Sequence, residues 1–371
     1  MIDTITLQIE RLDIPEKNLE FFKTSKSGNM TKYFFNPDAS LGEYLPRITI
    51  KKVEGLSGLY TESTDIEFST PKILHNTNYY GITQIDKDSF TDALYRKLCH
   101  IFGDSPIKRE VIEYANIKNI AFAFNFILSQ NYGYPIEFLK VIPFLGINKN
   151  YNKTKDTYYT EADEMGFCGR IYNKQVSWKM YDKGAEIITN AKNKTEKDIA
   201  IKLKHNELPN KIIRMELTYQ NRFTLKRHLK TKIGGGDNQE RHLSEVFNDK
   251  LCQEILLESF DKIANELNIN AMDTPLFPIH EYFKRTKQAN MPLEIAYAWL
   301  GRCLATQQAG SQQLKLISDE FYTRQNRAQA DKRIKGLIQQ YPLPSFTLKQ
   351  VFEECRKQLV DFKIMKPENY N

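Results

Sequence analysis

Apolar and polar residues alternate in the segment Val176-Ser177-Trp178-Lys179-Met180-Tyr181-Asp182-Lys183, which runs directly into Gly184-Ala185-Glu186. A period of two predicts a β-strand, because successive side chains of a strand point to opposite faces of a sheet. Trp178 and Met180 would pack in a core, whereas Tyr181 and Lys183 would share the other face, with Glu186 just beyond. A tyrosine at a strand end, beside a cation and a carboxylate, could attack a phosphodiester. An ordinary amphipathic strand explains the same pattern.

The alternation recurs through the first two-thirds of the chain, between clusters of Asn, Gly, Pro and Asp. Strands are predicted at Thr4–Glu10, Arg47–Val53, Asp65–Ser69, Ile117–Phe126, Gly166–Asn173, Val176–Asp182 and Lys211–Tyr219. Apolar residues three and four positions apart predict a helix over Ser89–Phe102, ended by Gly103. A second helix is predicted from Glu186 to about Lys204.

A run of three glycines, Gly234-Gly235-Gly236, marks a change of pattern. Beyond it, helical periodicity dominates the segments Glu245–Leu267, Pro292–Thr306 and Leu348–Phe362. The sequence therefore predicts an α+β domain over residues 1–235, followed by a smaller helical domain over residues 236–371.

The overall composition is that of a soluble globular protein, with 41% apolar and 27% charged residues among 371. A formal charge of +7 favours a polyanionic partner. Five widely spaced cysteines without a C-x-x-C motif argue against a disulfide framework or a zinc knuckle and favour a reducing compartment. No segment approaches the roughly 20 apolar residues that cross a bilayer, and the N-terminal segment does not read as a signal peptide. We expect a cytoplasmic protein with no membrane partner.

The predicted strands carry polar side chains on the faces opposite their apolar residues. Asn125 and the small residue Ala121 share such a face on Ile117–Phe126, and Arg214 neighbours Glu216 on Lys211–Tyr219. If these strands belong to one sheet, its polar face gathers Glu67, Tyr181, Lys183, Arg214 and Glu216.

This set has a chemical logic, because a phenol with a pKa of about 10 needs a nearby cation or metal to become a nucleophile at neutral pH. Glu67 and Glu216 could hold Mg²⁺ or Mn²⁺, which would polarise a phosphate oxygen. Arg214 and Lys183 could offset the charge that builds on phosphorus in the transition state. Solvated surface pairs explain the Arg-x-Glu spacing as well.

A basic segment follows this strand, with five cations and no acid between residues 222 and 232: Arg222, Lys226, Arg227, Lys230 and Lys232. Such a segment suits contacts with a phosphate backbone, and a solvated helix face is the alternative. The six histidines form no His-x-His motif, and the glycine run lacks the pattern of a phosphate-binding loop.

Four blocks in order over roughly the first 220 residues resemble phage and plasmid replication proteins of the filamentous-phage gene II and gene X family. They are the opening Met1-Ile2-Asp3 before an alternating strand, the segment 65–81 with its Glu67 and Pro71-Lys72 pair, the segment 179–186 around Tyr181, and Arg214-Met215-Glu216.

The resemblance implies a rolling-circle replication initiator, with a central, mainly antiparallel sheet and flanking helices like those of rolling-circle nucleases. Tyr181 would nick origin DNA at a specific site, leaving a 5′-phosphotyrosyl link and a free 3′-hydroxyl, and strand transfer would later close the circle. Lys183 would lower the phenol pKa or bind phosphate, and Arg214 would clamp the phosphate. Glu186 would orient Lys183 or join the metal shell, and Glu67, Glu216 and Asp3 would hold Mg²⁺ or Mn²⁺.

The implied partners are single-stranded and supercoiled double-stranded origin DNA, together with a host helicase and polymerase. The basic segment and the helical domain would contact or deform the duplex, and the helical domain could carry homo-oligomer contacts.

One position departs from the family pattern. Where the family has Arg-Ile-Asp on a central strand, this chain reads Asn119-Ile120-Ala121, and the acid is missing. Asn125 is an alternative oxygen ligand on the same face. The missing acid favours a second hypothesis, a non-catalytic origin-binding or copy-control protein derived from such an initiator.

Overall fold

The structure is a computed structural model of the chain. The residues that it describes are 1–10, 12, 14, 16–37, 42–55, 60–103, 107–129, 135–139, 152–159, 165–172, 174–219, 222–236, 239–265, 275–276, 283, 286–298, 300–301, 329 and 346–367.

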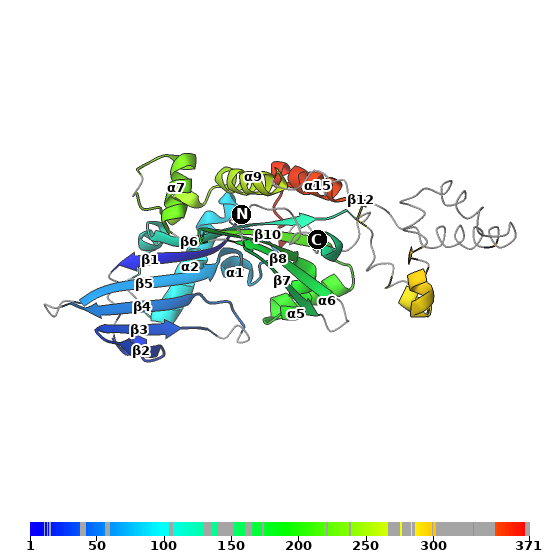
Figure 1. The fold of residues 1–371 in the computed structure, drawn as a ribbon. Coiled ribbons are helices and arrows are strands. Elements are labelled where there is room, and N and C mark those ends of the chain that lie inside the picture. Colours follow the sequence, from blue (N-terminus) through cyan, green and yellow to red (C-terminus); the bar gives the residue numbers. More distant parts are fainter. Residues whose placement is uncertain are drawn as a thin grey trace.

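A ten-stranded sheet dominates the described part of the chain (Figure 1), in the order β2-β3-β4-β5-β1-β6-β10-β9-β8-β7. Every neighbouring pair in it is antiparallel. The strands are β1 Ile2–Glu10, β2 Lys23–Ser27, β3 Met30–Phe35, β4 Arg47–Glu54, β5 Tyr60–Ser69, β6 Asn116–Ile127, β7 Asn152–Tyr159, β8 Met165–Tyr172, β9 Val176–Asp182 and β10 Ile212–Tyr219. The predicted α+β class and antiparallel sheet are confirmed.

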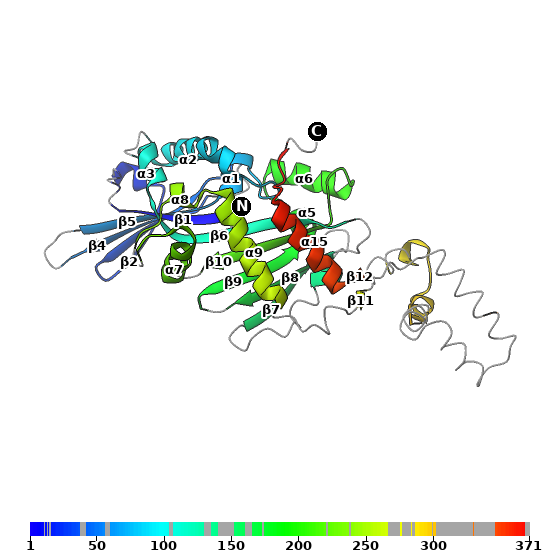
Figure 2. The same cartoon turned by 90° about the horizontal axis from the view of Figure 1, so that it is seen from above.

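The apolar face of the sheet forms the main core, because most of the alternating apolar residues of the central strands point to this side. Four long helices cover it: α2 Lys87–Phe102, α7 Arg222–Ile233, α9 Asp249–Asn265 and α15 Leu348–Asp361. Figure 2 shows α9 and α15 side by side across the sheet, with α7 beside them. Ring contacts join the sheet to these helices: Phe68 with Phe90, Phe126 with Phe260, and Tyr219 with His228.

Two further helices, α5 Lys183–Asn190 and α6 Lys194–Lys204, pack beside the other face of the sheet, at the end where β9 stops and β10 begins (Figure 1). They share a second apolar cluster with Ile212 and Tyr79. The sequence predicted one helix over this region, but the Asn193 side chain accepts a hydrogen bond from the Glu196 N–H and starts a new helix there.

The seven predicted strands are present. The helix predicted over Ser89–Phe102 is α2, and Gly103, with φ of 73°, ends it. Three strands of the large sheet, β2, β3 and β7, were not expected, and neither were the two short strands β11 Pro275–Leu276 and β12 Phe346–Thr347, which pair with each other. β2 reads Lys-Thr-Ser-Lys-Ser with every side chain exposed, so it has no apolar alternation to detect. Short helices complete the fold: α1 Thr70–His75, α3 Arg109–Glu113, α4 Pro135–Leu139 and α8 Leu243–Val246.

The helices that follow residue 235 join the core of the sheet. Residues of α8, α9 and α15 belong to the same hydrophobic cluster as β1, β6 and β10. The part of the predicted helix Pro292–Thr306 after residue 301 lies outside the described residues. None of the helices in the described ranges combines the length and the apolar composition that crossing a bilayer requires.

Candidate active site

Six of the predicted site residues meet on the face of the sheet opposite α7, α9 and α15. We call them the Arg214 cluster: Asp3, Tyr181, Lys183, Glu186, Arg214 and Glu216. Strand register explains the meeting, because Tyr181 of β9 and Asn125 of β6 both lie opposite Arg214 of β10. Asp3 joins from β1, where a shift of register between Ile2 and Thr4 interrupts the regular alternation.

Arg214 is the centre of the cluster, and its side chain is fully buried. Its guanidinium forms ion pairs with Asp3 Oδ1 at 2.6 Å and with Glu216 Oε1 at 3.0 Å. Its Nη1 also donates to Asn125 Oδ1 at 2.9 Å and to the Asn78 carbonyl at 3.2 Å. Burial works to lower the pKa of Arg214, but Asp3, Tyr181 and Glu216 outweigh it and raise this pKa. Arg214 is therefore permanently charged.

Tyr181 is half-buried, and its hydroxyl donates to Glu216 Oε1 at 2.7 Å. Burial, and then the charge of Glu216, raise the pKa of this phenol well above 10. Glu216 is shifted the other way: burial works to raise its pKa, but Arg214 and Lys179 outweigh it and lower the pKa below 4.5. The pair is thus a neutral phenol hydrogen-bonded to an ionised carboxylate, the arrangement of a nucleophile beside a general base.

Lys183 is the first residue of α5 and is fully buried. Its Nζ donates to Glu186 Oε2 at 2.6 Å and to Asn78 Oδ1 at 2.7 Å, and it lies 5.9 Å from the centre of the Tyr181 ring. Burial lowers the pKa of Lys183, and the Glu186 carboxylate opposes that shift. One role predicted for Lys183 was to lower the pKa of the Tyr181 phenol. In the folded protein, burial instead raises the pKa of that phenol.

Local sequence fixes the start of α5, and so the position of Lys183. The Asp182 carboxylate accepts a hydrogen bond from the Ala185 N–H at 2.9 Å, which ends β9 and caps the helix. Gly184 is required next, because a β-carbon there would lie 2.4 Å from the backbone oxygen of Asn210. This close approach holds the helix against the chain that leads into β10.

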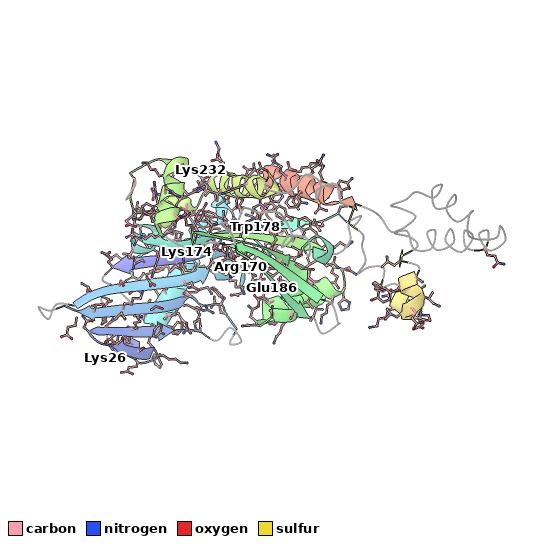
Figure 3. All side chains as sticks on the ribbon, in the orientation of Figure 1. Lys26, Arg170, Lys174, Trp178, Glu186 and Lys232 are labelled. Atoms are coloured by element: carbon pink, nitrogen blue, oxygen red, sulfur yellow. The ribbon has the colours of Figure 1, made fainter. Side chains whose placement is uncertain are left out.

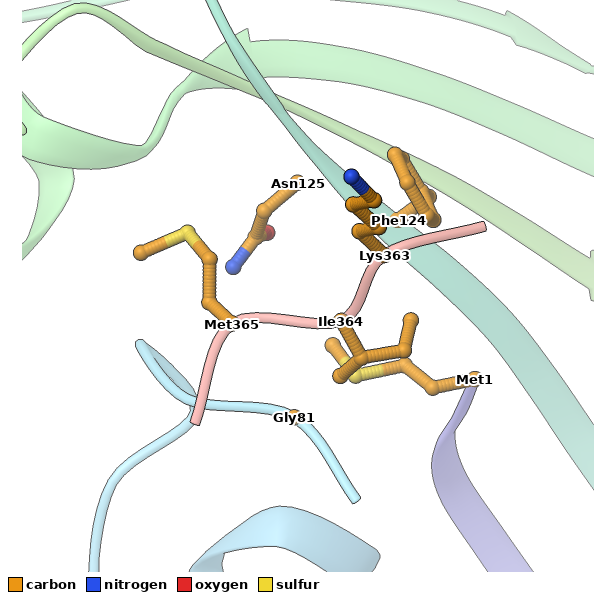
Figure 4. Close-up of a pocket in the computed structure, with 7 residues that line it drawn as sticks. All are labelled: Met1, Gly81, Phe124, Asn125, Lys363, Ile364 and Met365. Atoms are coloured by element: carbon orange, nitrogen blue, oxygen red, sulfur yellow. The ribbon is translucent and has the colours of Figure 1, made fainter. Parts of the chain in front are cut away.

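Asn125, which accepts a hydrogen bond from Arg214, is itself held by the segment that contains Tyr79 and Gly81. The Asn125 amide donates to the Tyr79 carbonyl at 2.9 Å, and the Gly81 N–H donates to the Met365 carbonyl at 2.8 Å. Figure 4 shows a small pocket in which the segment that carries Met365 runs between Asn125 and Gly81. Sequence reasoning gave no role to Asn78, although it stands in the block 65–81. Asn78 lies in a loop, so no strand alternation was available to predict which way its side chain points.

Glu67 does not join the cluster. It is half exposed and pairs with Arg47 on the neighbouring strand at 3.5 Å. Glu67 lies on β5, three strand spacings from β10, or roughly 14 Å across the sheet. The register also separates the two carboxylates along the strands, since Glu67 lies opposite Thr6 and Glu216 opposite Ala123. Glu67 and Glu216 therefore cannot share one metal ion, whose ligands lie within about 2.6 Å of it.

The remaining carboxylates do not fit a divalent cation in this arrangement. Arg214 stands between Asp3 and Glu216 and pairs with both. The Asn125 oxygen, the alternative ligand, already accepts from Arg214. In the described ranges, no three His, Cys, Asp or Glu side chains are grouped as a metal site. The cluster in this arrangement thus offers no set of free carboxylate oxygens for a metal.

The basic segment lies on the other side of the sheet as helix α7. Figure 3 shows Lys232 of α7 and Glu186 of α5 on opposite sides of the strands. The fold supplies the acids that the segment itself lacks: Arg222 and Lys226 both pair with Glu240, and Lys232 pairs with Glu258. Arg227 is exposed, and Lys230 is partly exposed. Three of the five cations predicted for DNA contact thus form ion pairs within the protein, with two carboxylates.

Comparison of the chain with protein-family models, with curated proteins and with solved structures finds no match in any of the three.

Proposed function

We propose that the protein is a DNA nickase and strand transferase that uses Tyr181 as its nucleophile. The observation that carries the proposal is the hydrogen bond of 2.7 Å from the Tyr181 phenol to Glu216, beside the buried cations Arg214 and Lys183. Nucleophile and base lie within hydrogen-bond reach, and Arg214 holds the base in place, which is the recurring geometry of an activated nucleophile.

Two residues in ion-pair contact with the cluster core are partly exposed. Lys179 is 40% exposed and Glu186 is 31% exposed, whereas Arg214 and Lys183 are not exposed at all. A phosphate would therefore approach from the side of Lys179 and meet the half-buried Tyr181. Lys179 would pair with the incoming phosphate, and Lys183, behind the ring, would stabilise charge on it electrostatically.

The biological role that we propose follows the sequence resemblance. A nick that leaves the 5′-phosphate on Tyr181 frees a 3′-hydroxyl, from which a host polymerase could extend while a helicase separates the strands. Because the tyrosyl bond conserves the energy of the phosphodiester, a later 3′-hydroxyl can reverse the attack and close a circle. This is initiation of rolling-circle replication, on a fold of the rolling-circle nuclease kind.

A second candidate is an origin-binding or copy-control protein without catalytic activity. The observation that favours it is that Arg214 is fully buried and its guanidinium pairs with Asp3, Glu216 and Asn125, so this cation does not face an incoming phosphate.

A covalent-adduct assay separates the two candidates. The full-length protein is incubated with a random-sequence library of single-stranded oligonucleotides, denatured in SDS, and resolved by electrophoresis. We expect protein that carries covalently bound DNA, with the attached strands sharing a cleavage sequence. Salt-sensitive binding without an adduct would favour the non-catalytic protein.

Replacing Glu240 with Gln is expected to tighten DNA binding. This change releases Arg222 and Lys226 from their shared acid, so each becomes available to a phosphate. For single strands, each new phosphate contact steepens the slope of log K against log salt by about 0.7. With two cations released, we expect the slope to steepen by up to about 1.4. Oligonucleotide titrations at several salt concentrations measure this slope.

The matched control for this variant is Glu245→Gln. Glu245 pairs with Arg241, whose side chain is 3% exposed and cannot reach DNA. An unchanged slope in Glu240→Gln, or an equal change in both variants, would show that α7 does not contact the nucleic acid.

A further inference from the structure

The charges of the Arg214 cluster balance one another. Three carboxylates, Asp3, Glu186 and Glu216, lie in ion-pair contact with three cations, Lys179, Lys183 and Arg214. A divalent cation is held where carboxylate charge exceeds the nearby positive charge. Adding one here would leave two uncompensated positive charges in a largely buried site, which is costly.

The geometry of Arg214 also fills the place that an ion would need. A metal bound by Asp3 and Glu216 would have to lie between their carboxylates, and the guanidinium lies there, 2.6 Å from one and 3.0 Å from the other. Its planar fork is fixed by Asn125 and by the Asn78 carbonyl. These contacts hold the Glu216 oxygen that accepts from Tyr181.

We propose that Arg214 occupies the position that a divalent cation would take, and that Tyr181 attacks DNA without a metal, with Glu216 as the acceptor of its proton. The proposal rests on the proposed nicking function and specifies its chemistry. Glu216 is a second catalytic residue beside Tyr181, since it contacts the reacting hydroxyl, and Arg214 is a positioning residue that acts through Glu216.

The step balances without any co-reactant. A bond forms between the Tyr181 oxygen and phosphorus, and the bond between phosphorus and the 3′-oxygen breaks. The phenol proton passes to Glu216 and finally to the departing 3′-oxygen. One phosphodiester replaces another, nothing is oxidised or reduced, and the reverse sequence rejoins the strand.

The first test compares adduct formation by the full-length protein in Mg²⁺, in Mn²⁺ and in excess EDTA, with the random-sequence single-stranded library as the probe. We expect equal rates in the three conditions. An adduct that requires metal overturns this inference and leaves the tyrosine chemistry standing. If no adduct forms under any condition although DNA is bound, the proposed function fails, and this inference fails with it.

The second test removes the proposed proton acceptor. Glu216→Gln is expected to slow adduct formation by about 10²–10⁴-fold, the usual loss with a general base, while oligonucleotide affinity is kept. The control Glu113→Gln makes the same change at a partly exposed ion pair with Arg109, outside the Arg214 cluster. It should leave the rate of adduct formation unchanged. An unchanged rate in Glu216→Gln overturns the role of Glu216.

The third test asks whether a metal ion can bind between Asp3 and Glu216 once Arg214 is removed. A merely structural role of Arg214 would not create such a metal site. Arg214→Ser leaves space beside Asp3 and Glu216, whereas Arg214→Met fills it with an apolar side chain. We expect Mn²⁺ alone to raise the Tm of the Ser variant but not that of the Met variant or the wild type. Equal stabilisation of the wild type by Mn²⁺ overturns the inference. If the Ser variant fails to fold, the wild-type titration and the EDTA comparison decide.

Discussion

Arg214→Met is expected to lower the free energy of unfolding by about 3–5 kcal/mol, the usual cost of removing one partner of a buried ion pair. The variant keeps much of the side-chain volume but leaves Asp3 and Glu216 without their shared cation. Both carboxylates are nearly buried, with side chains 7% and 13% exposed, so water cannot replace the guanidinium. Equilibrium unfolding in urea measures the loss.

The loss should depend on pH. With Arg214 in place, burial already raises the pKa of Asp3 above 3.8, whereas Arg214 helps to hold the pKa of Glu216 below 4.5. Without Arg214, we expect burial to raise both folded-state pKa values above the unfolded ones. The penalty is therefore present at neutral pH and is relieved as the pH falls through the raised folded-state values, so wild type and variant converge in acid. Arg356→Met is the control, because Arg356 forms an exposed pair with Asp261 and its loss should leave the stability nearly unchanged. A loss equally small in Arg214→Met would contradict the central position of this residue.

Tyr181→Phe is expected to reduce covalent adduct to background while leaving oligonucleotide binding intact. The change removes the oxygen that would form the bond to phosphorus and keeps the ring. It also breaks the hydrogen bond to Glu216, which should cost about 1.5–3 kcal/mol of stability, the range for a hydrogen bond to a charged group. The adduct assay and a binding titration on the same preparation separate the chemical effect from the structural one.

Tyr172→Phe provides the matched control. Tyr172 lies on the same face of the neighbouring strand β8, opposite Ser177, and the Arg170 guanidinium stands 4.5 Å from the centre of its ring. The Phe variant keeps the ring and loses one hydroxyl, as at residue 181, so adduct formation should persist. Full adduct yield in Tyr181→Phe would exclude Tyr181 as the nucleophile.

Side-chain alternation was enough to predict most of the sheet and part of the site. The period of two in β9 and β10 placed Tyr181, Arg214 and Glu216 on the polar face, and antiparallel pairing brought them into one group. Asp3 entered the prediction through the resemblance, and the register shift in β1 turns it toward Arg214.

The distance between strands could not be read from local pattern. Glu67 shares the polar face with Glu216, but the strand order places them three strands apart. This order could not be predicted from local pattern, because it depends on long-range strand pairing. The same limit applies to α7, whose acids, Glu240 and Glu258, come from later in the chain. Ion pairing inside the Arg214 cluster was also hidden, since alternation gives the face of a residue but not its partner.

The most direct test of Tyr181 as nucleophile is mass spectrometry of the adduct after nuclease and protease digestion. We predict a nucleotide phosphate attached to the peptide that contains Tyr181. A phosphate mapped to any other residue, or no modified peptide from protein that has bound and cleaved DNA, would contradict the account.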